Sequence, residues 1–407
     1  MKWDLIELGE VMGVKHGFAF KGESFADAGE YVLLTPGNCY ESGGLRLKGD
    51  KEKYYLGGFP DEYLLQEGDM LVVMTDLINS APILGGSFLI PQSNRFLHNQ
   101  RLGLVQVTDE KRIDKRFLYY LLNTHSYRGQ VRGSASGATV RHTSPGRIKR
   151  CKVTVPRDVA YQSKIADTLS AYDELVENNR RRMELLEQAA RMLYQEWFSH
   201  LRFPGHEHTS VTNGIPAGWH RVPTPEAVDI NPTTKLSDEQ EHWYVEMADL
   251  PTDSMVIQNA IRRDGRSGSK FRNGDTLLAR ITPCLENGKT GFVNFMADGE
   301  AGRGSTEFIV LRSKRVTPEF VYCLARTYIF RENAVKSMVG SSGRQRVQES
   351  CFEKFMVWIP PHSLLNLFSE FAEPVFQQIK VLHAQNQKLR AARDLLLPRL
   401  MSGEIAV

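Results

Sequence analysis

Two long stretches of the chain place apolar residues alternately three and four positions apart. The first stretch runs from Ile165 to Trp197 and the second from Leu365 to Leu400. A three–four alternation over about five heptads is typical of a coiled coil rather than of an ordinary amphipathic helix. About 40 residues at ~1.5 Å rise would make each helix roughly 60 Å long. We expect the two helices to pair with each other, antiparallel, within one chain.

The seam of this predicted helix pair is mostly apolar but contains two asparagines. A polar seam residue can fix the register of a coiled coil, or it can mark a place where the seam opens to water or to a partner. Both interpretations stay open. Pro374 lies inside the second stretch and predicts a kink or a later helix start. The residues predicted to pair the helices are Leu169, Val176, Asn179, Leu186, Ile379, Leu382, Asn386 and Leu389.

Before each long stretch, short alternating apolar runs are separated by Gly, Pro, Asn and Asp, which is typical of short β-strands joined by turns. Gly68-Asp69 recurs 206 residues later as Gly274-Asp275, and Gly137 recurs as Gly343 at the same offset. These recurrences in one order predict two tandem copies of one plan. The expected fold class is α+β: two tandem α/β domains separated by two long antiparallel helices that form an intramolecular coiled coil with pseudo-twofold symmetry.

Five segments follow from this pattern, because a Pro- and Gly-containing stretch without helical period separates the copies. They are a first domain at 1–157, a first spacer helix at 158–202, a linker at 203–218, a second domain at 219–361, and a second spacer helix with a C-terminal tail at 362–407.

Composition narrows the class of protein. The 407 residues are 41% hydrophobic and 24% charged, and no apolar run reaches the ~18 residues that a membrane span needs. The first ten residues carry three acids, so we expect no secretory signal. The five cysteines are widely spaced, which favours reduced thiols in a cytoplasm over disulfides or a zinc ribbon.

The net charge of +3 conceals a strongly basic segment. Residues 115–157 contain ten Lys and Arg and no Asp or Glu. Weaker basic stretches recur in the second copy, at 262–272 and in the segment that ends at Arg346. A short charge run is usually a solvated face, but an acid-free run of 43 residues that is partly repeated favours nucleic acid.

Sequence motifs for catalysis fail at their essential positions. The stretch at 286–290 resembles the end of a phosphate-binding loop, but Pro283 replaces the required glycine. Ala135 stands where a nucleophile elbow needs serine. The Ile-Asn-Pro-Thr-Thr stretch at 230–234 lacks the Pro-Pro-aromatic ending of an adenine-methyltransferase motif. The sequence therefore predicts no catalytic residues and no metal site.

The chain resembles the specificity subunits of type I restriction–modification systems. The resemblance rests on the segment YQSKIADTLSAYDELVENNRRRMELLEQAARMLYQEWFSHLRFP, on the C-terminal segment ending LLPRLMSGEI, and on the two-copy layout. It implies two target-recognition domains that read a bipartite double-stranded DNA site. It also implies two methyltransferase subunits docked on the helices, and restriction subunits. The resemblance further implies that these partner subunits bind S-adenosylmethionine, ATP and Mg²⁺, whereas this chain binds no cofactor. The complex would act in a prokaryotic cytoplasm.

Residues for DNA contact come from chemistry, because Arg and Lys suit guanine and phosphate, whereas Asn and Gln suit adenine. For any one of them, phosphate contact or solvation competes with base readout. The predicted DNA-binding residues are Thr75, Asn79, Arg132, Arg141, His142 and Arg147 in the first copy, and Arg280, Lys289, Arg344, Gln345 and Arg346 in the second.

Three other functions stay open on the sequence. One is a specificity subunit of a related type II system that combines methylase and nuclease. Another is an enzyme that cuts or methylates DNA alone, and the third is a coiled-coil adaptor without DNA affinity.

Overall fold

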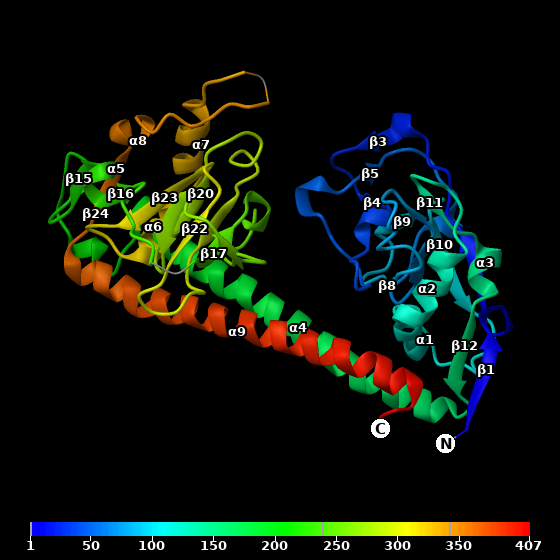
Figure 1. Cartoon of the computed structure of the whole chain (residues 1–407). Coiled ribbons are helices and arrows are strands. Elements are labelled where there is room, and N and C mark those ends of the chain that lie inside the picture. Colours follow the sequence, from blue (N-terminus) through cyan, green and yellow to red (C-terminus); the bar gives the residue numbers. More distant parts are fainter. Residues whose placement is uncertain (1, 238–239, 342) are drawn as a thin grey trace. The chain divides into compact units, whose positions relative to one another are not determined.

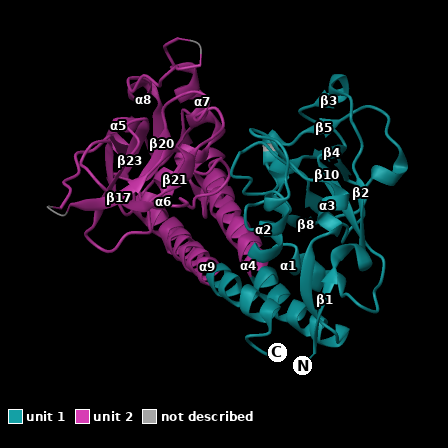
Figure 2. Ribbon diagram, turned by 45° about the vertical axis from the view of Figure 1, so that its right-hand side comes forward, with its two compact units in different colours: residues 1–175, 389–407 teal, residues 176–388 magenta. Residues whose placement is uncertain are grey.

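The computed structural model describes residues 2–237, 240–341 and 343–407. The chain forms two compact units, one of residues 1–175 and 389–407 and the other of residues 176–388 (Figure 2). Two long helices, α4 (Val159–Tyr194) and α9 (His362–Ser402), each contribute one end to each unit (Figure 1). Ser342, in the predicted second basic stretch, lies outside the described residues.

The first unit contains two four-stranded sheets and three short helices. One sheet has the strand order β2-β10-β6-β8 and the other β3-β5-β4-β9. Strand β6 is buried at all four positions, as expected for a central strand with an unbroken apolar run. The strands are β1 Trp3–Glu7, β2 Met12–His16, β3 Phe25–Ala26, β4 Tyr31–Leu34, β5 Tyr54–Tyr55, β6 Met70–Val73, β7 Thr75–Asp76, β8 Ser87–Leu89, β9 Phe96–His98, β10 Leu102–Val107, β11 Arg141–His142 and β12 Lys152–Pro156, and the helices are α1 Lys115–Leu121, α2 His125–Gly133 and α3 Pro145–Lys149.

The second unit repeats this plan. Its sheets have the orders β16-β23-β20-β21 and β18-β17-β22-β19, and in each unit the second sheet contains one parallel strand pair. The strands are β13 Val211–Thr212, β14 Ile215–Pro216, β15 His220–Pro223, β16 Val228–Ile230, β17 Glu241–Val245, β18 Ile261–Asp264, β19 Ser269–Arg272, β20 Thr276–Ala279, β21 Thr290–Phe292, β22 Ala301–Gly304, β23 Phe308–Ser313 and β24 Met356–Ile359, and the helices are α5 Thr224–Ala227, α6 Pro318–Arg326, α7 Tyr328–Lys336 and α8 Cys351–Lys354.

The recurring Gly-Asp pair makes the same turn before the central strand of each unit. Gly68 and Gly274 have positive φ angles of 79° and 88°, which glycine adopts without a steric penalty. The following aspartate then accepts a 2.8 Å hydrogen bond from the backbone N–H three residues earlier, at Gln66 in the first unit and Arg272 in the second. The two tandem copies predicted from the sequence are confirmed.

The long helices run antiparallel within each unit. In the first unit Leu169 of α4 lies in one core with Leu400 of α9, and in the second unit Ala190 of α4 lies in one core with Ala372 of α9. These helices therefore extend the core of each α/β globule instead of standing free of it. The predicted mixed fold with long helices is confirmed.

The predicted seam residues all lie on α4 and α9, and the two asparagines contact each other. The Asn179 side-chain N–H donates to Oδ1 of Asn386 at 3.0 Å, and the Asn386 side-chain N–H donates to the Val176 carbonyl at 3.0 Å. Both asparagines are buried. Because their polar groups bond across the pair in only one alignment, this arrangement agrees with a role in fixing the register. Leu169, Ile379 and Leu382 are buried, whereas Val176, Leu186 and Leu389 are partly buried.

The later start that Pro374 predicted for the second helix is wrong. Helix α9 begins at His362 and continues through the proline. Pro374 lies on the exposed side of the helix, as does Glu370, whose carbonyl loses its intrahelical donor. Water can satisfy that carbonyl, while Ala372 and Val375 bury the opposite side.

Within residues 2–237, 240–341 and 343–407, none of the helices combines the length and the apolarity of a membrane span.

Candidate nucleic-acid interface

The first basic loop, residues 134–147, is a tight hairpin. Backbone hydrogen bonds of 2.9 and 2.8 Å join Ser136 and His142 in both directions. Gly137 turns the chain with φ of 96°, and a Cβ there would lie 2.0 Å from the Val140 carbonyl oxygen. Only glycine fits such a position. Gly137 therefore has a structural role, which is to close the hairpin.

The hairpin is attached to the end of the central strand. Its strand β11 pairs with β7, and the Thr143 N–H donates to the Met74 carbonyl at 2.9 Å. Oγ1 of Thr75 lies 3.1 Å from Nδ1 of His142, so two predicted DNA-binding residues contact each other. Thr75 is buried, whereas His142 is exposed. Thr75 therefore supports the loop, and His142 is the member of the pair that a ligand can reach.

A second loop follows β7 beside the hairpin. Both carboxylate oxygens of the buried Asp76 accept backbone N–H groups, from Ile78 at 3.0 Å and from Ile83 at 2.9 Å. These bonds fix the turn that presents the exposed side chain of Asn79. Leu77 and Ile78 are also exposed, by 61% and 57%, next to Asn79. Sequence reasoning missed this apolar pair, although two large apolar residues in a polar turn are a visible signal.

The arginines of the first basic loop hold the hairpin together. Arg141 donates to the Arg132 carbonyl at 3.0 Å, and Arg147 donates to Oγ of Ser136 at 2.9 Å. Neither guanidinium forms an ion pair with a described residue, and both are partly exposed. The loop therefore carries uncompensated positive charge, as a phosphate-contacting surface requires.

Other arginines of the acid-free segment are already engaged by backbone carbonyls or by acids from distant parts of the chain. Arg128 is 6% exposed and donates to two backbone carbonyls, those of Glu41 and Pro82. The ion pairs join Arg116 to Asp167 at 2.7 Å and Arg157 to Asp4 at 2.8 Å. The charge estimated from residues 115–157 alone is therefore larger than the charge exposed in the folded unit.

The second basic loop, described at residues 339–341 and 343–347, is built in the same way. Backbone hydrogen bonds of 3.0 Å join Val339 and Arg346 in both directions. The Val347 N–H donates to the Arg280 carbonyl at 2.9 Å, which repeats the bond from Thr143 to Met74. Each unit thus places one loop with basic side chains at the end of its central strand.

The five predicted residues of the second unit have different surroundings. Arg346 forms an ion pair with Glu307 at 2.6 Å, and hydrogen bonding by Arg346 holds the pKa of the Glu307 carboxyl below its usual value. The Lys289 ammonium donates to the Met247 and Ala248 carbonyls at 2.5 and 3.3 Å. Both cations therefore stabilise the fold.

The other three are more open to a ligand. Arg344 is exposed and Gln345 is partly exposed, and the backbone of Gln345 bonds to Thr282. Arg280 is partly exposed and lies 3.5 Å from Glu349.

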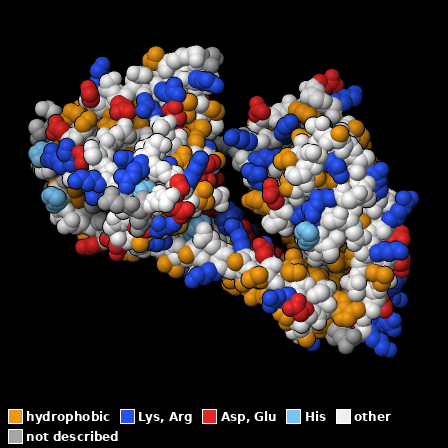
Figure 3. Space-filling view, viewed as in Figure 1, with side chains coloured by type: hydrophobic (Ala, Val, Ile, Leu, Met, Phe, Trp, Pro, Cys, Tyr) orange, Lys and Arg blue, Asp and Glu red, His pale blue; other side chains and the backbone are white. Residues whose placement is uncertain are grey.

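The other predicted basic stretch of the second unit, residues 262–272, lies largely on strands β18 and β19. Figure 3 shows Lys and Arg side chains spread over one face of the unit, with acids among them. Arg262 and Arg263 of β18 lie over the rings of Trp243 and Tyr244, at 5.2 and 5.1 Å from the ring centres. Arg303 of β22 also lies over the ring of Tyr244, at 4.7 Å, but it is buried and donates to backbone carbonyls.

Within the described ranges, no group of three or more His, Cys, Asp or Glu side chains is arranged to hold a metal ion.

The chain is similar in sequence to known DNA specificity proteins. Residues 1–188 match the family model for the type I restriction modification DNA specificity domain. The type I restriction enzyme MjaIX specificity subunit of Methanocaldococcus jannaschii is 24% identical over 347 residues, which are 81% of this chain and 77% of that protein. The EcoEI specificity subunit of Escherichia coli is 31% identical over 157 residues, but these are 37% of this chain and 26% of that protein.

A solved structure has the same fold along almost the whole chain. The S subunit of a type I restriction–modification system from M. genitalium superimposes with a TM-score of 0.58 at 16% identity, covering 98% of this chain and 96% of that one. The relatives are named as specificity subunits of type I restriction enzymes, which agrees with the specificity subunit predicted from the sequence. Residues 1–188 thus match the DNA specificity domain of type I restriction–modification systems, and most of the chain is similar in sequence to their specificity subunits.

Proposed function

We propose that the chain recognises a bipartite double-stranded DNA target and recruits methyltransferase and restriction subunits to it. The observation that carries this proposal is the repeated construction of the basic loops. In each unit a backbone bond ties the loop to the end of the central strand, from Thr143 to Met74 and from Val347 to Arg280. Two copies of one framework with different side chains are suited to two different parts of a DNA site.

In the first unit, Arg141 and Arg147 contact phosphates or guanines, and Asn79 reads an adenine. Bidentate arginine suits guanine O6 and N7, and asparagine suits adenine N6 and N7. The absence of an ion-paired acid on either arginine among the described residues supports this assignment. Arg132 and Thr75 position these side chains, and His142 adds a polar contact at the hairpin.

In the second unit, Arg344 and Gln345 are the base-contacting residues. Both are at least partly exposed, and the backbone of Gln345 is fixed by Thr282. Arg346 and Lys289 position the loops through Glu307 and backbone carbonyls. Arg280 joins the contact surface from the strand end.

The chemistry of modification belongs to other chains in this proposal. Two methyltransferase subunits bring S-adenosylmethionine and methylate adenine, which must leave the base stack to be reached. Restriction subunits bring ATP hydrolysis with Mg²⁺ and cleavage. This chain binds none of these cofactors and acts in a prokaryotic cytoplasm.

A titration of the purified chain with target-containing DNA at two salt concentrations tests the proposal. Affinity should fall steeply as salt rises, because phosphate contacts release counterions. The Arg141→Ala plus Arg147→Ala variant should bind at least about tenfold more weakly. The charge-matched control is Arg116→Ala plus Arg157→Ala, whose cations are already paired with Asp167 and Asp4.

The control should bind nearly as well as the unmodified chain. Equal affinities for both double variants would contradict the role of the first basic loop. Weak binding without salt dependence would favour a coiled-coil adaptor instead.

A further inference from the structure

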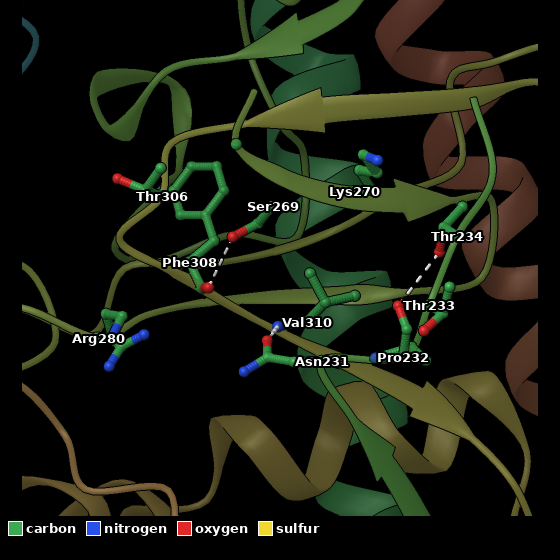
Figure 4. Close-up of a pocket in the computed structure, with 11 residues that line it drawn as sticks. Asn231, Pro232, Thr233, Thr234, Ser269, Lys270, Arg280, Thr306, Phe308 and Val310 are labelled. Atoms are coloured by element: carbon green, nitrogen blue, oxygen red, sulfur yellow. Dashed lines mark hydrogen bonds between the residues drawn. The ribbon is translucent and has the colours of Figure 1, made fainter. Parts of the chain in front are cut away.

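The Asn-Pro-Thr-Thr segment at 231–234, which matches no complete sequence motif, lines a hollow on the surface of the second unit (Figure 4). The segment follows β16 and lies beside β19 and β23. The hollow has a volume of about 290 Å³, well above the ~10–15 Å³ that a cavity needs to hold one water molecule. It can therefore hold a small polyatomic group together with water.

Both ends of the segment are fixed to the sheet. The Asn231 N–H donates to the Val310 carbonyl at 2.8 Å, and the Val310 N–H donates to Oδ1 of Asn231 at 2.9 Å. At the other end, Arg312 donates to Oγ1 of Thr234 at 2.8 Å and forms a buried ion pair with Asp275 at 2.7 Å. The segment is thus held in place before any ligand binds.

This attachment leaves the side-chain NH₂ group of Asn231 for a ligand. Its side-chain oxygen is engaged by Val310, and Figure 4 shows its nitrogen turned away from Val310 and toward the side where Arg280 lies. Asn231 is exposed and has a positive φ of 49°, a conformation that asparagine tolerates better than most residues. The amide N–H group therefore faces the open side of the hollow.

Two cations complete the wall. Lys270 forms no ion pair with a described residue. Arg280 pairs through Nη1 with Glu349 at 3.5 Å, and its buried Nε has no hydrogen-bond partner in the described part of the chain. None of the described residues that line the hollow is acidic. A site with an amide N–H, an ammonium and a guanidinium favours an anionic acceptor over a base edge, which also presents donors.

We propose that this hollow binds one phosphate group of the DNA backbone and so positions the second unit on its part of the target. The inference rests on the proposed function and adds the ligand class and the residues of one site. Backbone contacts of this kind fix the register of a protein on DNA without carrying sequence information. The same group in free phosphate would satisfy the same donors, so the test must separate the two sources.

Two variants test the site without removing its supports. Lys270→Gln removes a cation that pairs with no described residue. Asn231→Asp keeps the oxygen that accepts from Val310 but replaces the N–H donor with an acceptor. The control is Lys314→Gln, which removes a cation of the same unit that pairs with Asp229 at 3.4 Å. Thermal unfolding of all three should match the unmodified chain, and Lys270→Gln alone still tests the site if Asn231→Asp unfolds.

Full-length chains are titrated with target-containing DNA over a range of chloride concentrations. Lys270→Gln should reduce the slope of log affinity against log salt by about one, and Asn231→Asp should weaken binding about tenfold, whereas Lys314→Gln should change neither. A neutral methylphosphonate at the contacted position should weaken binding by the unmodified chain but not by Lys270→Gln.

Unchanged slopes and affinities in both variants, with salt-dependent binding by the unmodified chain, would overturn the phosphate site and leave the proposed function intact. If the unmodified chain binds DNA without salt dependence, the proposed function itself fails, and the site falls with it. Competition by inorganic phosphate that Lys270→Gln abolishes, with DNA binding unchanged by that variant, would assign the hollow to free phosphate and overturn the DNA contact.

Discussion

The central strands of the two units have the same framework but end differently. Strand β6 and strand β20 each bury four residues and follow the same Gly-Asp turn. Each is followed by a residue whose carbonyl accepts the N–H of the basic loop, but that residue is the buried Met74 in one unit and the partly exposed Arg280 in the other. The buried pattern preserves the fold, while the side chains at the strand end are free to differ.

The turn aspartates show a second difference. Asp275 is buried in an ion pair with Arg312, whereas the position 206 residues before Arg312 is Gln106. Asp69 is partly exposed and serves only its own turn in the bonds of the first unit. The second unit has therefore converted a local turn into a link that also holds Thr234. Equivalent turn hydrogen bonds in the two units therefore contribute unequally to stability.

The largest expected effect is on this link. Asp275→Ala should lower the free energy of unfolding of the second unit by roughly 3 kcal/mol, because it leaves the guanidinium of Arg312 buried without its partner. Asp69→Ala should cost at most about 1 kcal/mol, the value of one ordinary hydrogen bond. Hydrogen exchange followed by mass spectrometry measures each unit separately. Equal losses in the two units would contradict the distinction.

The next largest difference in stability is expected at the contacts between each globule and α4. Glu187 is buried, accepts from the Met255 N–H and the Tyr322 hydroxyl, and its pKa is raised by that burial. Glu187→Ala should cost about 1–3 kcal/mol by stranding buried donors, and Glu187→Gln should cost less because it keeps an acceptor. Asp173 accepts from Tyr120 at 2.7 Å in a more exposed place, so Asp173→Ala should cost less than Glu187→Ala.

Chemical denaturation with a probe in each unit checks this order. Because burial raises the pKa of Glu187, the charged form is penalised in the folded chain, and the gap between Glu187→Gln and the unmodified chain should narrow as pH rises above the usual glutamate range. A gap that widens with pH would contradict the assignment.

The smallest effect concerns the ion pair of the second basic loop. Arg346 lowers the pKa of Glu307, so this pair stabilises the fold above the usual glutamate pKa and its contribution is lost as pH falls through the lowered value. Glu307→Gln should therefore lower the thermal midpoint slightly at pH 7 and hardly at all at pH 3. In the first unit, no acid among the described residues forms an ion pair with Arg141 or Arg147. A pH-independent difference would show that the pair does not stabilise the loop.

Much of the framework could be predicted because it is periodic or repeated. The seam positions follow from the three–four alternation, and strands such as Met70–Val73 follow from apolar runs bounded by turn residues. The sheet formed by β17, β18, β19 and β22 could not be predicted, because its Arg and Lys side chains hide the alternation. Arg303, for example, is buried only because Tyr244 and several carbonyls come from elsewhere in the chain.

The candidate site was harder to predict than the framework. The sequence identified the basic segments, but it could not show that Arg157 meets Asp4, or that Arg346 meets Glu307, since these partners are distant in sequence. It also could not show that Lys289 is used on backbone carbonyls. Which cations are open to DNA depends on tertiary contacts, and a linear charge pattern does not contain them.

The most direct test of the central claim is to co-express the chain with a methyltransferase subunit and map the modified adenines. We predict a split motif, with two short specific parts separated by a fixed spacer, and a change in only one part when Arg344 and Gln345 are both replaced by alanine. Methylation at a single contiguous motif, or a double variant that alters both parts equally, would contradict recognition of a bipartite site by two separate domains.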